Sequence, residues 1–191
     1  MDLASLQGAT AFRVQQRFTA MVNRYDVSIA RADWSAGEPV AFVQQKRMAL
    51  REQVTLYTDE SRTAELCSFR ARQVLDIGAG YDVRAHDGSV IGSFRKDFGR
   101  SLLVSTFHLE QAGAPPATGS ERNIVVALLR RVSDIPLAVH FDFSTAEGEP
   151  VMSSERQWGL RDAYRIQVHA PWLDRRLALS MAVGLDALLA R

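Results

Sequence analysis

The stretch LALSMAVGLDALLA, residues 177–190, decides the fold that this sequence predicts. It consists mainly of strong helix formers, and Asp174 lies upstream as a candidate N-cap. Apolar residues fall on every side of this helix and Asp186 is its only charge, which is typical of a helix buried in a protein or in a membrane. Fourteen residues at about 1.5 Å each extend roughly 21 Å, short of the ~30 Å hydrocarbon core of a bilayer. We therefore predict a helix buried inside a β-rich domain.

The chain before this helix reads mostly as short β-rich runs separated by turn residues, a pattern that favours a barrel or a sandwich. Asp87-Gly88 predicts a tight hairpin because both residues tolerate the positive φ of a primed turn, and Gly37 and Gly148 occupy comparable positions. Residues 111–121 predict an exposed loop between strands. The predicted strands are residues 12–18, 25–29, 39–43, 54–57, 64–71, 74–77, 81–85, 90–94, 102–109, 123–130, 137–143 and 164–168.

A weak repeat links three of these hairpins. Its copies begin with YDV at residues 25–27, YDV at 81–83 and FDF at 141–143, and a glycine turn follows each one. The physical interpretation is a recurring hairpin that cannot bury its apolar face alone, and chance resemblance among hairpins is the alternative. Each returning strand ends on basic side chains, namely Lys46, then Arg95 and Lys96, and then Arg156.

Length and composition predict one domain, residues 1–191, of a globular protein. The 23 basic and 22 acidic residues nearly balance, which argues against a nucleic-acid partner. Cys67 is the only cysteine, so neither an intramolecular disulfide nor a cysteine-based zinc site can form, and a buried thiol is a better interpretation than a catalytic one. The first residues lack the pattern of a signal peptide, and no apolar run reaches about 18 residues. We predict a cytoplasmic protein that does not span a membrane.

The residues that usually carry chemistry form no recognisable catalytic pattern. No two of the four histidines have the i, i+4 spacing of a metalloprotease, and no Gly-x-Ser-x-Gly elbow is present. Gly78-Ala79-Gly80 lacks the further glycine of a nucleotide-binding fingerprint. We therefore predict no catalytic residue, no metal site and no cofactor.

Several motifs resemble the tubby C-terminal-like superfamily, which includes phospholipid scramblases and the plant LURP-one-related proteins. DGSVIG at residues 87–92, leading to Arg95 and Lys96, is the most specific of them. The resemblance implies a mainly β fold, a closed antiparallel barrel of about twelve strands around the hydrophobic C-terminal helix. Residues 111–121 and 157–162 would embellish that barrel. The other motifs are FVQQK at 42–46, LYTDE at 56–60, FRAR at 69–72, YDV at 81–83 and DRR at 174–176.

The chain also departs from the scramblases. It lacks their proline-rich N-terminal region and their cysteine cluster for acylation, and it lacks their acidic Ca²⁺ loop. Asp82 and Asp87 are too few to supply the oxygen ligands of an EF-hand. Lipid scrambling and Ca²⁺ dependence therefore do not carry over to this chain.

Tubby-like domains are associated with phosphoinositide recognition, so the resemblance implies a non-enzymatic domain that binds an anionic lipid headgroup or another anion. The candidate ligand-binding residues are Lys46, Arg95, Lys96 and Arg156, which could gather on one rim of the barrel. The alternative for these side chains is ordinary exposed charges paired with nearby acidic residues. Two other functions stay open: a structural or protein-interaction domain, homodimeric through a strand edge or its tryptophans, and an enzyme with a pocket at a barrel mouth.

Overall fold

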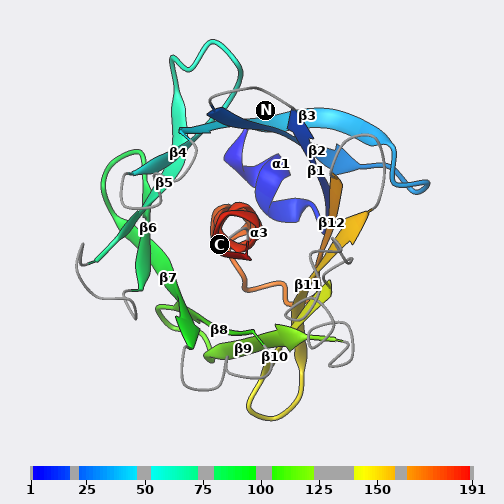
Figure 1. Ribbon diagram of the computed structural model, residues 1–191, viewed down its shortest axis with the longest axis vertical. Helices are drawn as coiled ribbons and strands as arrows, with labels where there is room; N and C mark the ends of the chain where they lie inside the picture. Colours follow the sequence, from blue (N-terminus) through cyan, green and yellow to red (C-terminus); the bar gives the residue numbers. More distant parts are fainter. Residues whose placement is uncertain are drawn as a thin grey trace.

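Twelve antiparallel strands close into a barrel around helix α3, so the predicted fold class is confirmed (Figure 1). The computed structural model describes residues 2–17, 22–46, 53–72, 80–97, 105–122, 140–157 and 163–189. The strands are β1 (Ala11–Arg17), β2 (Val22–Ala30), β3 (Ala36–Lys46), β4 (Val54–Tyr57), β5 (Glu65–Ala71), β6 (Tyr81–Ala85), β7 (Val90–Asp97), β8 (Thr106–Gln111), β9 (Ala117–Glu121), β10 (His140–Thr145), β11 (Pro150–Gln157) and β12 (Ala163–Val168), and the helices are α1 (Leu3–Gly8) and α3 (Arg175–Leu189).

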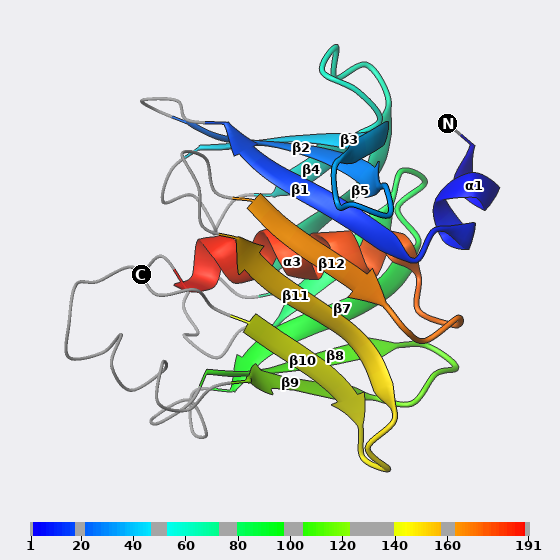
Figure 2. The same cartoon turned by 90° about the vertical axis from the view of Figure 1, so that its right-hand side faces the viewer.

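The topology is a simple up-and-down barrel. Each strand pairs with the next one along the chain, and β12 closes the ring by pairing with β1. Odd-numbered strands therefore all end at one end of the barrel, where α3 also ends and Asp186 lies (Figure 2). We call this end the Asp186 end. The other end carries the turns at residues 31–35, 58–64, 86–89, 112–116 and 146–149, and α1 and the start of α3 lie beside it.

Helix α3 is buried along most of its length, as its all-round apolarity predicts. Leu177, Leu179 and Met181 are fully buried in the barrel core. The Asp174 carboxylate caps the helix by accepting a 2.8 Å hydrogen bond from the Arg176 backbone N–H. Neither helix in the described part of the chain is long and apolar enough to cross a membrane, which agrees with the prediction made from the length of residues 177–190.

Helix α1, which the sequence patterns did not predict, packs beside the start of α3. Asp2 caps it by accepting a 2.7 Å hydrogen bond from the Ser5 N–H, and Leu6 is fully buried. The Gln7 side-chain amide donates a 2.8 Å hydrogen bond to Asp174, so the two helices meet through their polar ends. This contact fixes the beginning of the buried helix.

The prediction of a loop over residues 111–121 is wrong for its second half. Residues 117–121 form β9, which pairs with β8 and β10 and completes the barrel. Small residues suit this strand because the Phe143 ring covers it: a Cβ atom added at Gly119 would lie 2.3 Å from that ring. The small residues Ala117, Gly119 and Ser120 therefore reflect close packing here, not a loop.

Gly148 and Gly88 occupy turns with φ of 86° and 83°, as predicted, whereas Gly37 does not. Gly37 lies within β3, where an added Cβ would meet the Ile29 carbonyl oxygen at 2.7 Å. The left-handed residue of the β2–β3 turn is Trp34, with φ of 64°. The predicted strands at 74–77 and 123–130 lie outside the described residues.

The three predicted hairpins are β2–β3, β6–β7 and β10–β11, which recur every four strands around the ring. The ring can therefore be divided into three four-strand units, β1–β4, β5–β8 and β9–β12. On the second strand of each unit, an aromatic residue is followed by an aspartate on the outer face. That aspartate pairs with an arginine at or just after the end of the preceding strand. The pairs are Arg17–Asp26, Arg72–Asp82 and Arg122–Asp142, with nitrogen–oxygen distances of 2.6, 2.6 and 2.7 Å.

Candidate functional site

The four basic residues predicted to bind an anion all lie near the Asp186 end, but they do not share one face. Arg95 is exposed on the outer face of β7, while Lys96 shares the inner face with Phe94 and has its ammonium 6.0 Å from the centre of the Phe107 ring. Arg156 lies on the inner face of β11, opposite Tyr164. Lys46 is the last residue of β3, and its side chain lies outside the described part of the structure.

The predicted equivalence of these residues is correct only in part. Tyr25 faces Val43, Tyr81 faces Phe94 and Phe141 faces Ser154 in the three hairpins. The residue two positions after each of these partners is Gln45 in β3, Lys96 in β7 and Arg156 in β11. Lys96 and Arg156 therefore correspond to Gln45 and not to Lys46. Because β3, β7 and β11 are four strands apart, the basic residues are spread around the ring and do not form one compact pocket.

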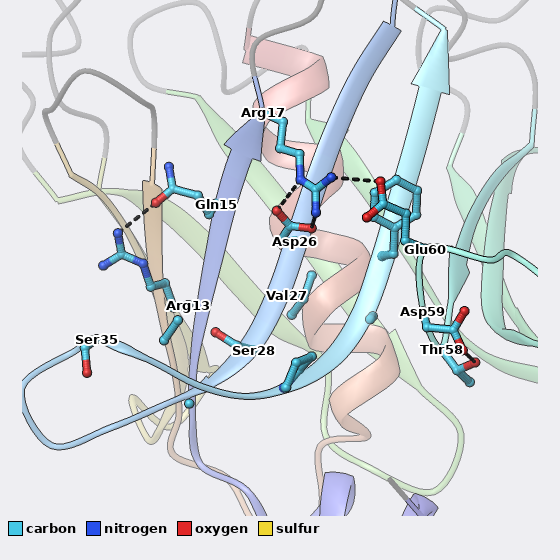
Figure 3. A pocket seen from close by; sticks show the side chains of 15 residues that line it. Arg13, Gln15, Arg17, Asp26, Val27, Ser28, Ser35, Thr58, Asp59 and Glu60 are labelled. Carbon is cyan, nitrogen blue, oxygen red and sulfur yellow. Dashed lines mark hydrogen bonds and ion pairs between the residues drawn. The ribbon is translucent and has the colours of Figure 1, made fainter.

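A groove on the outer wall of β1, β2 and β3 is a better-defined site. It forms because the β2–β3 turn, which crosses in front of β1 in Figure 3, bends over the outer wall. In this turn the Trp34 carbonyl accepts a 3.1 Å hydrogen bond from Arg13 on β1, and the Trp34 ring lies against Arg165 on β12. We call it the β1–β3 groove; its volume is about 660 Å³. It is lined by Arg13, Gln15, Arg17, Asp26, Val27, Ser28, Ser35, Ala36, Gly37, Pro39, Ala41, Phe42, Thr58, Asp59 and Glu60.

One end of the groove holds a neutralised arginine. The Arg17 guanidinium donates two hydrogen bonds to Asp26, at 2.6 and 2.7 Å, and a third to Glu60 at 2.8 Å (Figure 3). Its carbon lies 5.6 Å from the centre of the Phe42 ring on the groove floor. The hydrogen bonds that Arg17 donates to these carboxylates raise its pKa, so this guanidinium is committed to partners within the protein.

The other end of the groove holds Arg13, and Arg165 lies next to Arg13 on β12, outside the lining of the groove. Arg13 donates to the Trp34 carbonyl and, at 2.7 Å, to the Gln15 side chain. Arg165 on β12 lies directly opposite Arg13, with its guanidinium carbon 5.2 Å from the centre of the Trp34 ring. Within the described residues neither arginine forms an ion pair, and the buried Arg165 Nε has no hydrogen-bond partner.

Near the end of α3, the half-buried Asp186 carboxylate has hydrogen-bond partners on two strands. The Tyr25 hydroxyl donates a 2.5 Å hydrogen bond to one oxygen, and the Tyr164 hydroxyl donates to the other. Both tyrosines are buried, and they come from β2 and β12. This cluster ties the last turns of α3 to the strands on either side of β1.

A hydroxyl–imidazole–carboxylate chain crosses the outer faces of β7, β8 and β9. The His108 Nε2 lies 3.1 Å from Asp97, and its Nδ1 lies 3.2 Å from the Thr118 hydroxyl. These residue types can relay protons, but β8 lies six strands from β2, on the opposite side of the ring from the groove, and none of the three lines it. They link three neighbouring strands. The described residues contain no group of three or more metal-ligating side chains.

Cys67 is buried on the inner face of β5, 3.6 Å from the Ser180 hydroxyl. Burial raises the pKa of this thiol to about 12, so it stays protonated at neutral pH. Because the thiolate is the nucleophile in cysteine chemistry, the interpretation of Cys67 as a core residue is supported.

Sequence reasoning missed the arginine end of the groove. Alternation along β1 puts Arg13, Gln15 and Arg17 on one polar face, and this signal was available. The pairing of β1 with β12 brings Arg165 to Arg13 across more than 150 residues of chain, and no local pattern reveals it. For the tryptophans, Trp34 among them, the sequence suggests only a role in a homodimer contact.

Comparison of the sequence with models of known protein families and with curated proteins gives no match. The resemblance to the tubby C-terminal-like superfamily therefore stays a prediction from the motifs.

Proposed function

We propose that this protein is a non-enzymatic binding domain and that the β1–β3 groove is its ligand site. The observation that carries the proposal is the groove itself, a concave site of about 660 Å³ with an apolar floor and a few polar groups at its edges. Small-molecule sites commonly combine these features. Phe42 and Pro39 supply apolar surface, and Arg13, Gln15 and Ser35 supply donors and acceptors.

The construction of the groove also suits binding. Its floor belongs to paired strands of a closed barrel, which hold their side chains in fixed positions. Its walls belong to two turns, residues 31–35 and 58–64, and turns can vary in sequence without disturbing the barrel. A rigid floor with variable walls is a common arrangement for recognising a ligand.

The groove can be tested with the neutral probe N-phenyl-1-naphthylamine, whose fluorescence rises in apolar sites. We expect the wild-type protein to bind this probe and Ser28→Phe to lose binding, because Ser28 lines the groove and a ring there would fill it. Ser93→Phe is the matched control, since Ser93 lies on the outer face of β7 and both serines are 8% exposed. Equal binding by the three proteins would contradict the proposed site.

A second candidate function is contact with an anionic membrane surface at the Asp186 end. The observation that favours it is the spacing of Lys46, Arg95 and Arg156 on strands four apart, which suits a flat anionic surface better than one headgroup. Co-sedimentation with phosphatidylcholine vesicles, with and without phosphatidylserine, tests it. Binding that needs phosphatidylserine and weakens in Arg95→Gln would support it, and equal sedimentation with both vesicles would refute it. The cytoplasmic location stays a prediction from the sequence.

A further inference from the structure

We infer that Arg13 and Arg165 bind the phosphate group of a phosphomonoester, either a soluble compound or a lipid headgroup. The inference rests on the proposed function of the β1–β3 groove, since Arg13 lines that groove. It assigns the anion to a place that the sequence did not indicate, on the outer wall of β1 and β12.

The first argument is the direct opposition of two positive charges. Arg13 and Arg165 are register partners in the antiparallel β1–β12 pair, so their Cβ atoms are about 4.5–5.5 Å apart on the same face. Like charges placed in this way destabilise a sheet. A bound anion between the two guanidinium groups would remove that repulsion.

The second argument is that the nearby carboxylates are committed elsewhere. Glu155 is the other cross-strand neighbour of Arg165, but it accepts a 2.7 Å hydrogen bond from Arg122. Asp26 lies on β2, opposite Gln15, and its carboxylate accepts two hydrogen bonds from Arg17. The protein thus neutralises Arg17 and Arg122 and supplies no carboxylate to the Arg13–Arg165 pair among the residues that the structure describes.

The third argument is that both guanidinium groups are held in place. Arg13 is fixed by the Trp34 carbonyl and by Gln15, and Arg165 is stacked on the Trp34 ring. Trp34 adopts a left-handed backbone conformation that costs free energy for a residue with a side chain, and such strain often occurs at functional sites. The buried Arg165 Nε has no acceptor among the described residues, so the protein leaves this donor of the guanidinium group unsatisfied.

The chemistry of the donors favours phosphate. Each guanidinium carries five N–H donors in a planar fork, and such forks bind phosphate and carboxylate oxygens in pairs. Two forks together match the three terminal oxygens of a phosphomonoester better than the two oxygens of a carboxylate. The rest of the ligand would then lie in the groove, along Pro39 and Phe42.

The test follows the side-chain Nε–Hε signals of Arg13 and Arg165 by NMR during titration of the folded full chain with phenyl phosphate, at constant ionic strength. We expect both signals to shift and binding to weaken by about tenfold or more in Arg165→Gln. Arg70→Gln, an exposed arginine on β5, is the matched control and should bind like the wild type. Vesicles of phosphatidylcholine with and without phosphatidic acid distinguish the sources: vesicle binding that depends on Arg165 indicates a lipid headgroup, and phenyl phosphate binding alone indicates a soluble ester.

Unmoved Arg13 and Arg165 signals, or equal affinity in Arg165→Gln and the wild type, would overturn the inference. N-Phenyl-1-naphthylamine has no charge, so it reports on the groove independently. Binding of that probe without a phosphate response would reject the arginine site and leave the groove as a ligand site. Loss of both responses in a folded protein would reject both proposals.

Discussion

At the scale of single residues, Asp186 shows how the fold accommodates a charge in an apolar helix. The sequence marks Asp186 as the one ionisable residue of residues 177–190, and it predicts that a partner is needed. The partners could not be predicted, because Tyr25 lies 161 residues away and both tyrosines are placed by the closing of the ring. Aspartate near a helix C-terminus opposes the helix dipole, and two phenol donors offset this cost.

We expect Asp186→Ala to lower the free energy of unfolding by about 1–3 kcal/mol for each of the two tyrosine hydroxyls, because each loses its hydrogen bond to this carboxylate. Urea denaturation followed by circular dichroism measures the change. Asp186→Asn should fall between the two proteins, because its amide oxygen can accept from only one side of the cluster. An alanine variant as stable as the wild type would show that the two hydroxyls find other partners.

Residue-scale predictions were least successful where they depended on strand register. The sequence grouped Lys46 with Lys96 and Arg156, but the register puts Gln45 at the matching inner position. A shift of one residue moves a side chain to the other face of a strand. Composition alone cannot detect such a shift when basic and amide residues are adjacent.

At the scale of elements, the buried helix was predictable because its composition leaves no polar face. Leu179 is fully buried, so Leu179→Asp would put an unpaired charge in the barrel core, at a cost of several kcal/mol. We expect this variant not to fold, as judged by circular dichroism and by dispersion of NMR signals. Val90→Asp, at a position that is 55% exposed, is the control and should fold normally. A folded Leu179→Asp protein would contradict the placement of α3.

Strand β9 was not predictable, because its sequence resembles that of a loop. Proline and glycine in residues 113–119 are strong turn signals, and the packing of Phe143 over Gly119 depends on the neighbouring strand β10. By contrast, β4 and β6 match their predicted ranges because alternating apolar residues mark them. Local patterns thus identify strands with large side chains and miss a strand whose small residues make room for a neighbour.

Gly119→Ala tests this explanation. The added Cβ would lie 2.3 Å from the Phe143 ring, so we expect a loss of about 1–3 kcal/mol in the free energy of unfolding, measured by urea denaturation. Gly8→Ala is the control, because nothing lies within 4 Å of a Cβ there. In a Phe143→Leu background the same Gly119→Ala change should cost less, since the smaller side chain leaves space. An equal cost in both backgrounds would mean that overlap with the ring is not the cause.

At the scale of the whole molecule, the barrel consists of three four-strand units with the same arginine–aspartate pair on the outer wall. The recurring YDV and FDF motifs signalled this organisation, but the arginines precede them at distances that vary with the intervening segment. Only the ring topology shows that Arg17, Arg72 and Arg122 are equivalent. The groove breaks this symmetry. Among the described turns, the β2–β3 turn is the one whose Trp34 contacts the outer faces of the neighbouring strands, through Arg13 on β1 and Arg165 on β12.

The repeated pairs should contribute modestly to stability and in a pH-dependent way. In the Arg122–Asp142 pair both side chains are nearly half exposed, at 46% and 47%, so a double-mutant cycle with Arg122→Gln and Asp142→Asn should give a coupling of about 0.2–1 kcal/mol at neutral pH. Hydrogen bonds from Arg122 lower the pKa of Asp142 below its usual value, although burial opposes this shift. The stabilisation is therefore complete above the ordinary pKa of an aspartate, about 4, and it is lost as the pH falls through the lowered value.

Urea denaturation at several pH values measures that loss, and the Arg72–Asp82 pair supplies a matched cycle. We expect a smaller coupling there, because a single hydrogen bond of 2.6 Å is seen between the described Arg72 and Asp82 side chains, whereas two join Arg122 to Asp142. Salt should weaken both couplings, since charges at the surface are screened. A coupling in either pair that persists unchanged in acid would show that packing of the arginine stem, and not its charge, holds the outer wall together.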